Sequence, residues 1–343
     1  MTLQLSIIVP AFNEAPRLAD GMRRFEAAVD DGAVDLARTE LLVIDDGSTD
    51  ETADVARKLL VSIPHHRVVT LPSNRGKGAA VRTGVSVASG EYTAYMDADM
   101  AIDPHAVPLL VAGLATNDLA IGSRALTDST VDTTYALRSL MGRLFNRLVT
   151  TGTGLRLHDT QCGFKAFRTP VARLLFHLVR IDRFAFDVEI LARARRLGLD
   201  ITEVPVHWKH VAGSSIHPLH DSVSMLADVY RSRLGMLATP PVPAVAVRDR
   251  AGRAGIGAMV ERINELLATT LDEVPASVVA HGTSVIVLLP LVEPQDVATL
   301  YSVLQAELEP FEVSRRTMTF DALRSLGPLA GRLHAPSVAG GSG

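Results

Sequence analysis

Two carboxylates spaced one residue apart mark the stretch with the clearest capacity for chemistry. Asp97 and Asp99 follow an apolar run that ends at Met96, so they come directly after a predicted buried strand. Two acids at positions i and i+2 suit a hard divalent cation and its attached phosphates. An ordinary turn can have the same sequence because Asp is common in turns, and the pattern alone favours that interpretation by about two to one.

Two other predicted strands also end in polar turns. The apolar run 5–10 leads to Asn13 and Glu14, and the run 40–45 leads to Asp46. Ligands of open α/β sheets bind in the crevice at the carboxyl ends of the strands. The sequence therefore predicts that these polar groups and the two acids share one crevice.

A basic, glycine-rich turn follows a further predicted strand at 67–71. Arg75 and Lys77 alternate with glycines at the start of a predicted helix, which is a favourable place for phosphate. The spacing differs from that of a nucleoside-triphosphate P-loop, and a solvated basic turn is equally consistent with it. The alternation of strands and helices predicts an α/β fold with a doubly wound, mostly parallel sheet.

Composition limits the class of protein. The 343 residues are 47% hydrophobic and 21% charged, typical of a globular chain with two domains or one large domain and an appendage. The net charge of -4 gives no electrostatic case for a nucleic-acid partner. The single cysteine, Cys162, excludes an intrachain disulfide, fits a reducing compartment, and is more consistent with a packed side chain than with a nucleophile.

The sequence contains no evident targeting or membrane-spanning segment. The first residues enter a predicted strand directly, without the charged and apolar regions of a signal peptide. No apolar run reaches the roughly 18–20 residues that span a bilayer. We therefore expect a cytoplasmic protein without a transmembrane helix, either soluble or peripheral at the inner face of a membrane.

Several motifs, each weak alone, occur in an informative order. They are Ile8 to Glu14, Ile44 to Asp50, Asn74 to Gly78, Met96 to Asp99, Asp159 to Lys165, Arg183 to Ile190, Glu203 to Trp208 and Gly213 to Ile216. With these motifs the chain resembles the family 2 glycosyltransferases, which are inverting enzymes of the GT-A fold. Within them it is similar to the polyprenyl- or dolichyl-phosphate β-glucosyltransferases and the dolichyl-phosphate mannosyltransferases. The resemblance covers roughly residues 3–235.

The resemblance implies transfer of a hexose, with glucose favoured, from a nucleotide-diphosphate sugar to a polyprenyl phosphate. UDP-glucose is the favoured donor, and GDP-mannose on the same acceptor is the nearest alternative. Two other classes stay open: a transferase acting on a soluble acceptor, and a non-enzymatic nucleotide-sugar sensor. A peripheral membrane contact, a membrane-protein partner and a homo-oligomer are further expectations.

The resemblance also assigns residues to the donor. Asp97 and Asp99 would flank the diphosphate and bind Mg²⁺ or Mn²⁺, with Asp99 as principal ligand. Water or Asp103 would complete the metal shell, because Ala101 stands where some relatives supply a ligand side chain. The nucleotide would contact Pro10, Ala11, Asn13, Glu14, Asp46, Arg75, Lys77, Asp97, Ala98 and Asp99.

On the acceptor side, two guanidinium groups suit a phosphate monoester. Arg124 and Arg138 are the predicted pair, with Lys165 as a third cation and Asp159 as an orienting or assisting acid. Such a phosphate is already anionic near neutral pH, so it needs little help from a general base. Gly142 stands where some relatives carry a serine, which leaves this predicted contact less complete.

Other polar residues have alternative interpretations. Asp187 and Glu189 lie two apart on a predicted helix, so we expect one to structure the site and the other to be solvated. Trp208 suits the core or the wall of an acceptor groove equally. Packed or solvated histidines are favoured over a zinc site at His207, His210, His217 and His220, by about five to one.

The remaining segments complete the predicted organisation. The catalytic domain would span 1–235, with a lid loop at 125–134 and an amphipathic helix at 216–235 that packs on the domain or contacts a membrane surface. A Pro-rich linker at 236–254 would precede a small α+β domain of ferredoxin-like character at 255–334, for which an interaction or regulatory role is a hypothesis. Residues 335–343 would form a flexible tail.

Overall fold

The computed structural model divides the chain into two compact units. One contains residues 1–169, 179–195 and 200–238, and the other contains 170–178, 196–199 and 239–343. The predicted boundary near residue 235 is thus close, but two earlier segments also belong to the second unit. The residues described are 3–132, 146–147, 149–150, 153–209, 211, 225, 227–228, 230–231, 239–249, 255–270, 276–281, 283–308, 311–326, 329 and 333.

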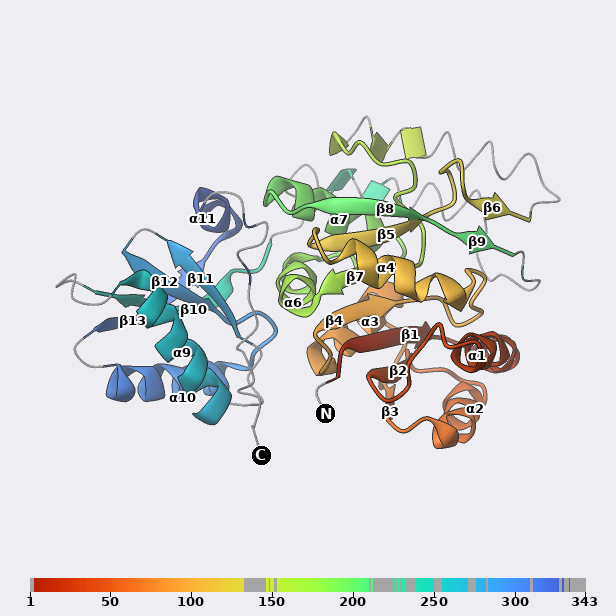
Figure 1. Ribbon diagram of the computed structural model, residues 1–343, viewed down its shortest axis with the longest axis horizontal. Helices are drawn as coiled ribbons and strands as arrows, with labels where there is room; N and C mark the ends of the chain where they lie inside the picture. The colour runs from red at the N-terminus through yellow and green to blue at the C-terminus, as the bar shows by residue number, and fades with distance from the viewer. Residues whose placement is uncertain are drawn as a thin grey trace. The chain divides into compact units, whose positions relative to one another are not determined.

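A mixed seven-stranded sheet forms the centre of the first unit (Figure 1). Its order is β3-β2-β1-β4-β7-β5-β8, and only β7 runs antiparallel to its neighbours. The predicted mostly parallel α/β sheet is therefore confirmed. The strands are β1 (Leu5–Ala11), β2 (Thr39–Asp45), β3 (His66–Thr70), β4 (Tyr92–Tyr95), β5 (Leu119–Ser123), β7 (Lys165–Arg168) and β8 (Ile201–Pro205).

The central strand β1 is buried along its whole length because helices cover both faces of the sheet. Ile7 and Val9 pack in one cluster with Leu18 and Phe25 of α1. Ile8 points to the opposite face, against Gly84 of α3. This two-sided burial explains the continuous apolar sequence of the strand, and it leaves the polar residues to the loops at its carboxyl end.

The helices of the first unit follow the strands as the alternating pattern predicted. The helices are α1 (Ala15–Asp30), α2 (Thr52–Leu59), η1 (Leu60–Ser62), α3 (Lys77–Val87), η2 (Pro104–Ala106), α4 (Val107–Gly113), α6 (Thr169–Leu178), most of which belongs to the second unit, and α7 (Phe186–Arg196).

Part of the predicted lid loop is a strand. β6 (Thr130–Val131) pairs in parallel with β9 (His207–Trp208), which continues the direction of β8 in Figure 1. The expectation of an open loop is therefore wrong for these two residues, because β9 satisfies their backbone. The predicted helix 216–235 lies largely outside the described residues. Residues 146–147 and 149–150 are helical.

The second unit contains a four-stranded antiparallel sheet in the order β11-β12-β10-β13. The predicted linker is wrong where it includes β10, which is an interior strand of this sheet. With α9 and α10, the chain order is β-α-β-β-α-β, the ferredoxin-like arrangement that was predicted. The elements are β10 (Val242–Arg248), α9 (Ile256–Thr270), β11 (Ser277–His281), β12 (Ser284–Leu288), α10 (Pro294–Glu307), β13 (Glu312–Met318) and α11 (Phe320–Ser325).

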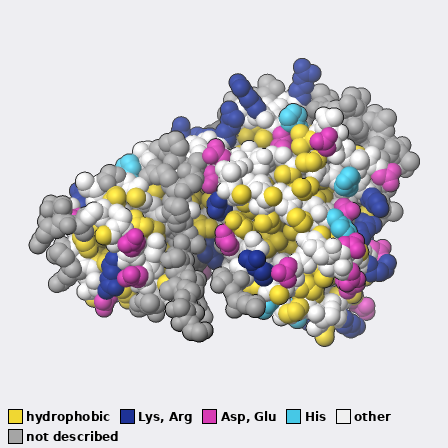
Figure 2. Space-filling view, in the orientation of Figure 1, with side chains coloured by type: hydrophobic (Ala, Val, Ile, Leu, Met, Phe, Trp, Pro, Cys, Tyr) yellow, Lys and Arg dark blue, Asp and Glu magenta, His cyan; other side chains and the backbone are white. Residues whose placement is uncertain are grey.

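The surface carries both signs of charge. Figure 2 shows basic and acidic side chains distributed over the visible face of the first unit. Among the described residues, no helix is both long enough and apolar enough to cross a bilayer.

Candidate active site

The predicted acids lie on a tight turn at the carboxyl end of β4. Ala98 is buried, whereas 45% of the Asp97 side chain and 12% of the Asp99 side chain are exposed. Asp99 Oδ1 accepts a hydrogen bond of 3.0 Å from the Ala101 amide, and Met100 has a left-handed φ of 44°. Such a backbone outlier in a non-glycine residue is held by its surroundings and is typical of functional turns.

Two side-chain cations neutralise this acidic turn. Lys77 Nζ lies 2.5 Å from Asp97 Oδ1, and Arg17 bridges Asp99 and Glu14. Burial alone would lower the pKa of Lys77, but the Asp97 carboxylate, with more distant acids, raises it above its usual value. Lys77 is therefore a firm positive charge at the start of α3. Arg17 is a neighbour of the acids that the sequence did not single out.

Glu14 is the least satisfied acid at this edge of the sheet. Its Oε2 atom is buried without a hydrogen-bond partner, while Oε1 lies 2.7 Å from Arg17. Burial raises the pKa of the Glu14 carboxyl to about 7, against the lowering effect of Arg17 and with support from the charges of Asp99 and Asp97. Glu14 therefore changes its charge near neutral pH, beside Asp97, Asp99 and their cations Lys77 and Arg17.

The loops after β1, β2 and β3 are joined by hydrogen bonds. Asp46 accepts from the backbone N–H groups of Arg75 and Gly76, at 2.9 and 2.6 Å. Burial raises the pKa of Asp46 in spite of these two donors. Asn13 has a left-handed φ of 52°, and its side chain accepts from the Thr49 amide at 2.8 Å. The predicted nucleotide residues therefore meet at one edge of the sheet.

The other predicted nucleotide contacts are simpler. Pro10 and Ala11 are buried at the end of β1, where Ala11 offers its carbonyl to the Asp46 amide at 2.8 Å. The Arg75 side chain is exposed. Lys77, the first residue of α3, is the basic residue of this turn that contacts an acid, Asp97.

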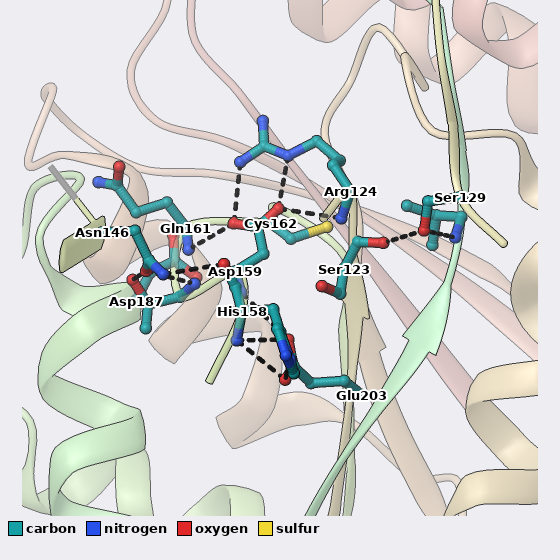
Figure 3. Close-up of polar contacts among 12 residues, drawn as sticks. Ser123, Arg124, Ser129, Asn146, His158, Asp159, Gln161, Cys162, Asp187 and Glu203 are labelled. Carbon is teal, nitrogen blue, oxygen red and sulfur yellow. Dashed lines mark hydrogen bonds and ion pairs between the residues drawn. The ribbon is translucent and has the colours of Figure 1, made fainter. Parts of the chain in front are cut away.

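On the acceptor side, Arg124 and Asp159 form a two-pronged ion pair (Figure 3). Arg124 Nε lies 2.7 Å from Asp159 Oδ2, a second guanidinium nitrogen lies 3.0 Å from Oδ1, and the Arg124 amide also donates to Oδ2. Burial alone would raise the pKa of Asp159, but the Arg124 charge and hydrogen bonds lower it below its usual value. Asp159 is therefore a carboxylate at neutral pH, and its two oxygens hold the guanidinium.

Two residues to which the sequence gives no role, Glu203 and Asn146, hold the backbone of the 158–160 segment. We call these two residues the clamp. Glu203 of β8 accepts from the backbone N–H groups of His158 and Asp159 at about 3.0 Å, and its Oε2 lies 2.8 Å from His158 Nδ1. Asn146 donates to the His158 carbonyl at 2.8 Å and accepts from Thr160. Figure 3 shows both side chains directed at the 158–160 segment. The residues of β8, Ile-Thr-Glu-Val-Pro, show no polar and apolar alternation that would indicate a role for Glu203.

Lys165 does not lie where an acceptor phosphate could reach it. Its side chain is fully buried, and Nζ lies 2.5 Å from both Asp187 Oδ1 and the Cys162 carbonyl. Asp187 also accepts from the Tyr95 hydroxyl. The prediction of Lys165 as a third acceptor cation is therefore wrong, because a core carboxylate already binds its ammonium group. Burial raises the pKa of the Cys162 thiol to about 12, which agrees with a packed side chain.

Two secondary predictions also change. Asp187 and Glu189 are both buried, so neither is solvated; Glu189 accepts from the Arg180 and Ile181 amides and pairs with Arg193. Asp103 caps η2 and lies 2.6 Å from His105, so in this structure it is not directed to the metal shell.

The short strand β9 connects the segment after the acidic turn with β6 and the residue that follows it. The Lys209 amide donates to the Ala101 carbonyl at 2.8 Å, and the Asp132 amide donates to the Trp208 carbonyl at 3.0 Å. Trp208 is half-buried and packs against the main core, so it occupies the middle of this connection. His207 is exposed, and its Nδ1 contacts Thr130; Arg138, Gly142 and the remaining predicted histidines lie outside the described residues.

The residues of the acidic turn fit a divalent cation that is shared with a substrate. Within the described ranges, no group of three or more His, Cys, Asp or Glu is arranged to hold a metal. Magnesium-like ions, however, are commonly held by one or two carboxylates together with substrate phosphates. Asp97 and Asp99 supply two carboxylates, and Glu14 Oε2 lies beside them without a hydrogen-bond partner.

Comparison with known proteins agrees with this geometry. The family described as glycosyl transferase family 2 matches residues 6–176. A dolichyl-phosphate beta-glucosyltransferase of Dictyostelium discoideum is 37% identical over 248 residues, covering 68% of this chain and 75% of that protein. The Homo sapiens protein of the same name is 36% identical over 250 residues, covering 69% and 76%.

A solved structure shares the fold. Glucosyl-3-phosphoglycerate synthase from Mycobacterium tuberculosis, in complex with Mn²⁺, UDP and glucosyl-3-phosphoglycerate, matches with a TM-score of 0.52 and 22% identity, over 70% of this chain and 83% of that one. The class is therefore that of glycosyltransferases with a GT-A α/β fold, as predicted. Within this class, the chain belongs to glycosyl transferase family 2.

Proposed function

We propose that this protein is an inverting hexosyltransferase that moves glucose from UDP-glucose to a polyprenyl phosphate. The curated relatives that share about two thirds of the chain are named for glucosyl transfer to dolichyl phosphate. Two features of the chain support this proposal: the acidic turn, which we assign to the donor diphosphate, and the partly exposed Arg124, which we assign to the acceptor phosphate.

The observation that supports the proposal most is a short structural connection between Arg124 and the acidic turn. Arg124 binds Asp159, and Gly163, four residues after Asp159, lies against the carboxylate of Asp97. Burial alone would lower the pKa of Arg124, but the Asp159 carboxylate raises it. A cation close to the acidic turn supports a transfer between two phosphate-bearing substrates.

The acceptor phosphate is the nucleophile of the proposed reaction. One of its anionic oxygens forms a bond to the anomeric carbon, and the bond from that carbon to the diphosphate oxygen breaks. The nucleoside diphosphate leaves with the electron pair, and the configuration at the carbon inverts. No proton has to be removed from a phosphate dianion, so the site needs no general base.

Asp159 therefore acts by orientation. Its low pKa and its two contacts with Arg124 make it a poor proton acceptor. It holds the guanidinium in one plane, which leaves the remaining N–H groups available to phosphate oxygens. Arg138, which lies outside the described residues, is proposed as the second guanidinium.

On the donor side, Lys77 and Arg17 supply fixed positive charge beside the acids. When bound, Mg²⁺ or Mn²⁺ would neutralise charge on the departing diphosphate, held by Asp97 and Asp99 with Asp99 as principal ligand. Asn13 and Asp46 join the loops beside these acids by accepting hydrogen bonds from the Thr49, Arg75 and Gly76 amides, and we assign these loops, with Glu14, to the nucleotide.

A transfer assay tests the proposal and separates its alternatives. Purified protein is incubated with Mn²⁺, polyprenyl phosphate and radiolabelled UDP-glucose or GDP-mannose, and lipid is then extracted. We expect label from UDP-glucose in the organic phase. Label from GDP-mannose alone would identify a mannosyltransferase, label only in a water-soluble product would indicate a soluble acceptor, and nucleotide-sugar binding without any transfer would indicate a sensor.

A further inference from the structure

The acidic turn is enclosed by two glycines that lie far from it in the sequence. Gly21 of α1 faces the backbone: a Cβ there would fall on the Ala98 carbonyl oxygen and 3.2 Å from the Asp99 carbonyl carbon. Gly163 faces a side chain: a Cβ there would lie 2.8 Å from Asp97 Cγ and closer still to one carboxylate oxygen. The turn can occupy its position only because both residues lack a side chain.

Gly163 is required here for space and not for backbone freedom. Its φ lies outside the left-handed region, so an alanine could adopt the same backbone conformation. The three atoms nearest to such a Cβ all belong to the carboxylate group of Asp97. A side chain at position 163 would therefore drive Asp97 to another rotamer while the local backbone could remain as it is.

The position of Gly163 is itself fixed by the buried Lys165. Lys165 Nζ donates to the carbonyl of Cys162 at 2.5 Å, one residue before Gly163. The same ammonium group is held by Asp187, which also accepts from the Tyr95 hydroxyl in β4. The strand that leads to the acidic turn and the segment that covers it are thus tied to one buried carboxylate.

Asp97 has two neighbours that decide where its carboxylate points. Lys77 binds Oδ1 at 2.5 Å, and the bare Cα of Gly163 lies against the other side of the group. Nearly half of the side chain is exposed, so packing elsewhere restrains it little. Displacing it would move a negative charge away from Lys77 and from the place where a diphosphate would be bound.

We propose that Gly163 is a positioning residue for Asp97: it fixes the direction in which this acid is presented to a metal-bound nucleotide, and the Lys165–Asp187 pair holds Gly163 in place. The metal and nucleotide part of this inference rests on the proposed function. The displacement of Asp97 follows from the packing alone. The two parts can therefore be tested separately.

The test compares Gly163→Ala with Gly113→Ala as a matched control. Gly113 of α4 is also tightly packed, since an added Cβ would lie 3.0 Å from Ala120 Cβ and Thr202 Cγ2, but it does not contact the acidic turn. Calorimetry measures the Kd of UDP with and without Mn²⁺ for wild type and both variants. Thermal melting reports their stability, and a crystal structure of Gly163→Ala locates Asp97.

For Gly163→Ala we expect the Mn²⁺-dependent gain in UDP affinity to fall by roughly 10- to 100-fold, the range seen when residues that orient a metal ligand are changed. Gly113→Ala should keep that gain even if its melting temperature falls. In the crystal structure, Asp97 should have left Lys77. An unchanged gain, an equal loss in the control, or an unmoved Asp97 would overturn the inference. If wild-type protein binds no UDP with Mn²⁺, the proposed function fails, and the position of Asp97 alone then decides the inference.

Discussion

Lys165→Met distinguishes a buried structural lysine from a cation that binds the acceptor. The Lys165 side chain is 0% exposed and that of Asp187 is 5% exposed. The substitution leaves the Asp187 carboxylate buried without its ammonium partner, which costs about 3–5 kcal/mol. At about 2–4 °C per kcal/mol for a unit of this size, the melting temperature should fall by roughly 6–20 °C.

The assay combines thermal melting with steady-state kinetics. Arg23→Met is the surface control, because the Arg23–Asp20 pair is exposed and is expected to contribute within about 1 kcal/mol. The double variant Lys165→Met/Asp187→Asn should regain most of the lost stability, since no buried charge remains and Asn can still accept from Tyr95.

The kinetics decide between the two roles. If Lys165 is structural, the double variant, which regains its stability, should have nearly the wild-type KM for polyprenyl phosphate. A Lys165→Met protein that melts with the wild type while its acceptor KM rises about tenfold or more, an energy of about 1.4 kcal/mol, would refute the structural assignment.

Three further predictions concern Asp159, Glu203 and Trp208. The pKa of Asp159 is lowered in the folded protein, so its contribution to stability is present above the ordinary Asp pKa of about 3.9 and is lost as the pH falls through the lower folded value. Urea unfolding between neutral and acid pH should therefore show a steeper acid loss for wild type than for Asp159→Asn, and parallel curves would contradict this. Glu203→Gln should raise the acceptor KM by roughly tenfold, because an amide group replaces one acceptor of the clamp, while the Kd for UDP with Mn²⁺ stays unchanged; equal losses in both would point to general unfolding. The fluorescence of Trp208, the single tryptophan, should change when UDP and Mn²⁺ bind, since its strand is bonded to the segment after the acidic turn; constant emission on addition of both would show that the strand does not sense the donor.

The sequence predicts the position of the acidic turn and of the loops beside it well, because local patterns determine that position. Strands buried on both faces, such as β1, are continuous apolar runs, and the polar residues that follow them occupy the carboxyl ends of the strands. Asn13, Asp46 and Asp97 could therefore be placed at one edge of the sheet before any coordinates were known. Lys77 could be placed near them because it begins a helix after a glycine.

The sequence gives a wrong role for Lys165 and no role for Glu203, because contacts between residues far apart in the chain determine where these side chains lie. Lys165 belongs to a residue type that is almost never fully buried without a partner, and its partner Asp187 lies 22 residues away on a helix. Glu203 is an isolated acid in an edge strand, and only the folded chain shows that it holds the Asp159 backbone.

At β10 the sequence predicts a linker instead of a strand, and the reason is local. Prolines at its start resemble a stiff linker, yet Pro243 is only the second residue of the strand and its carbonyl accepts from the Leu289 amide at 2.8 Å. The buried valines that follow it, Val245 and Val247, were the signal for a strand.

The most direct test of the account is a single-turnover transfer from radiolabelled UDP-glucose to polyprenyl phosphate, with wild type and Asp99→Ala measured side by side. Circular dichroism confirms that both are folded. The account predicts label in the organic phase for wild type and its loss in the variant, because Asp99 is the proposed principal ligand of the metal-bound diphosphate. Transfer by folded Asp99→Ala at the wild-type rate would contradict the central claim.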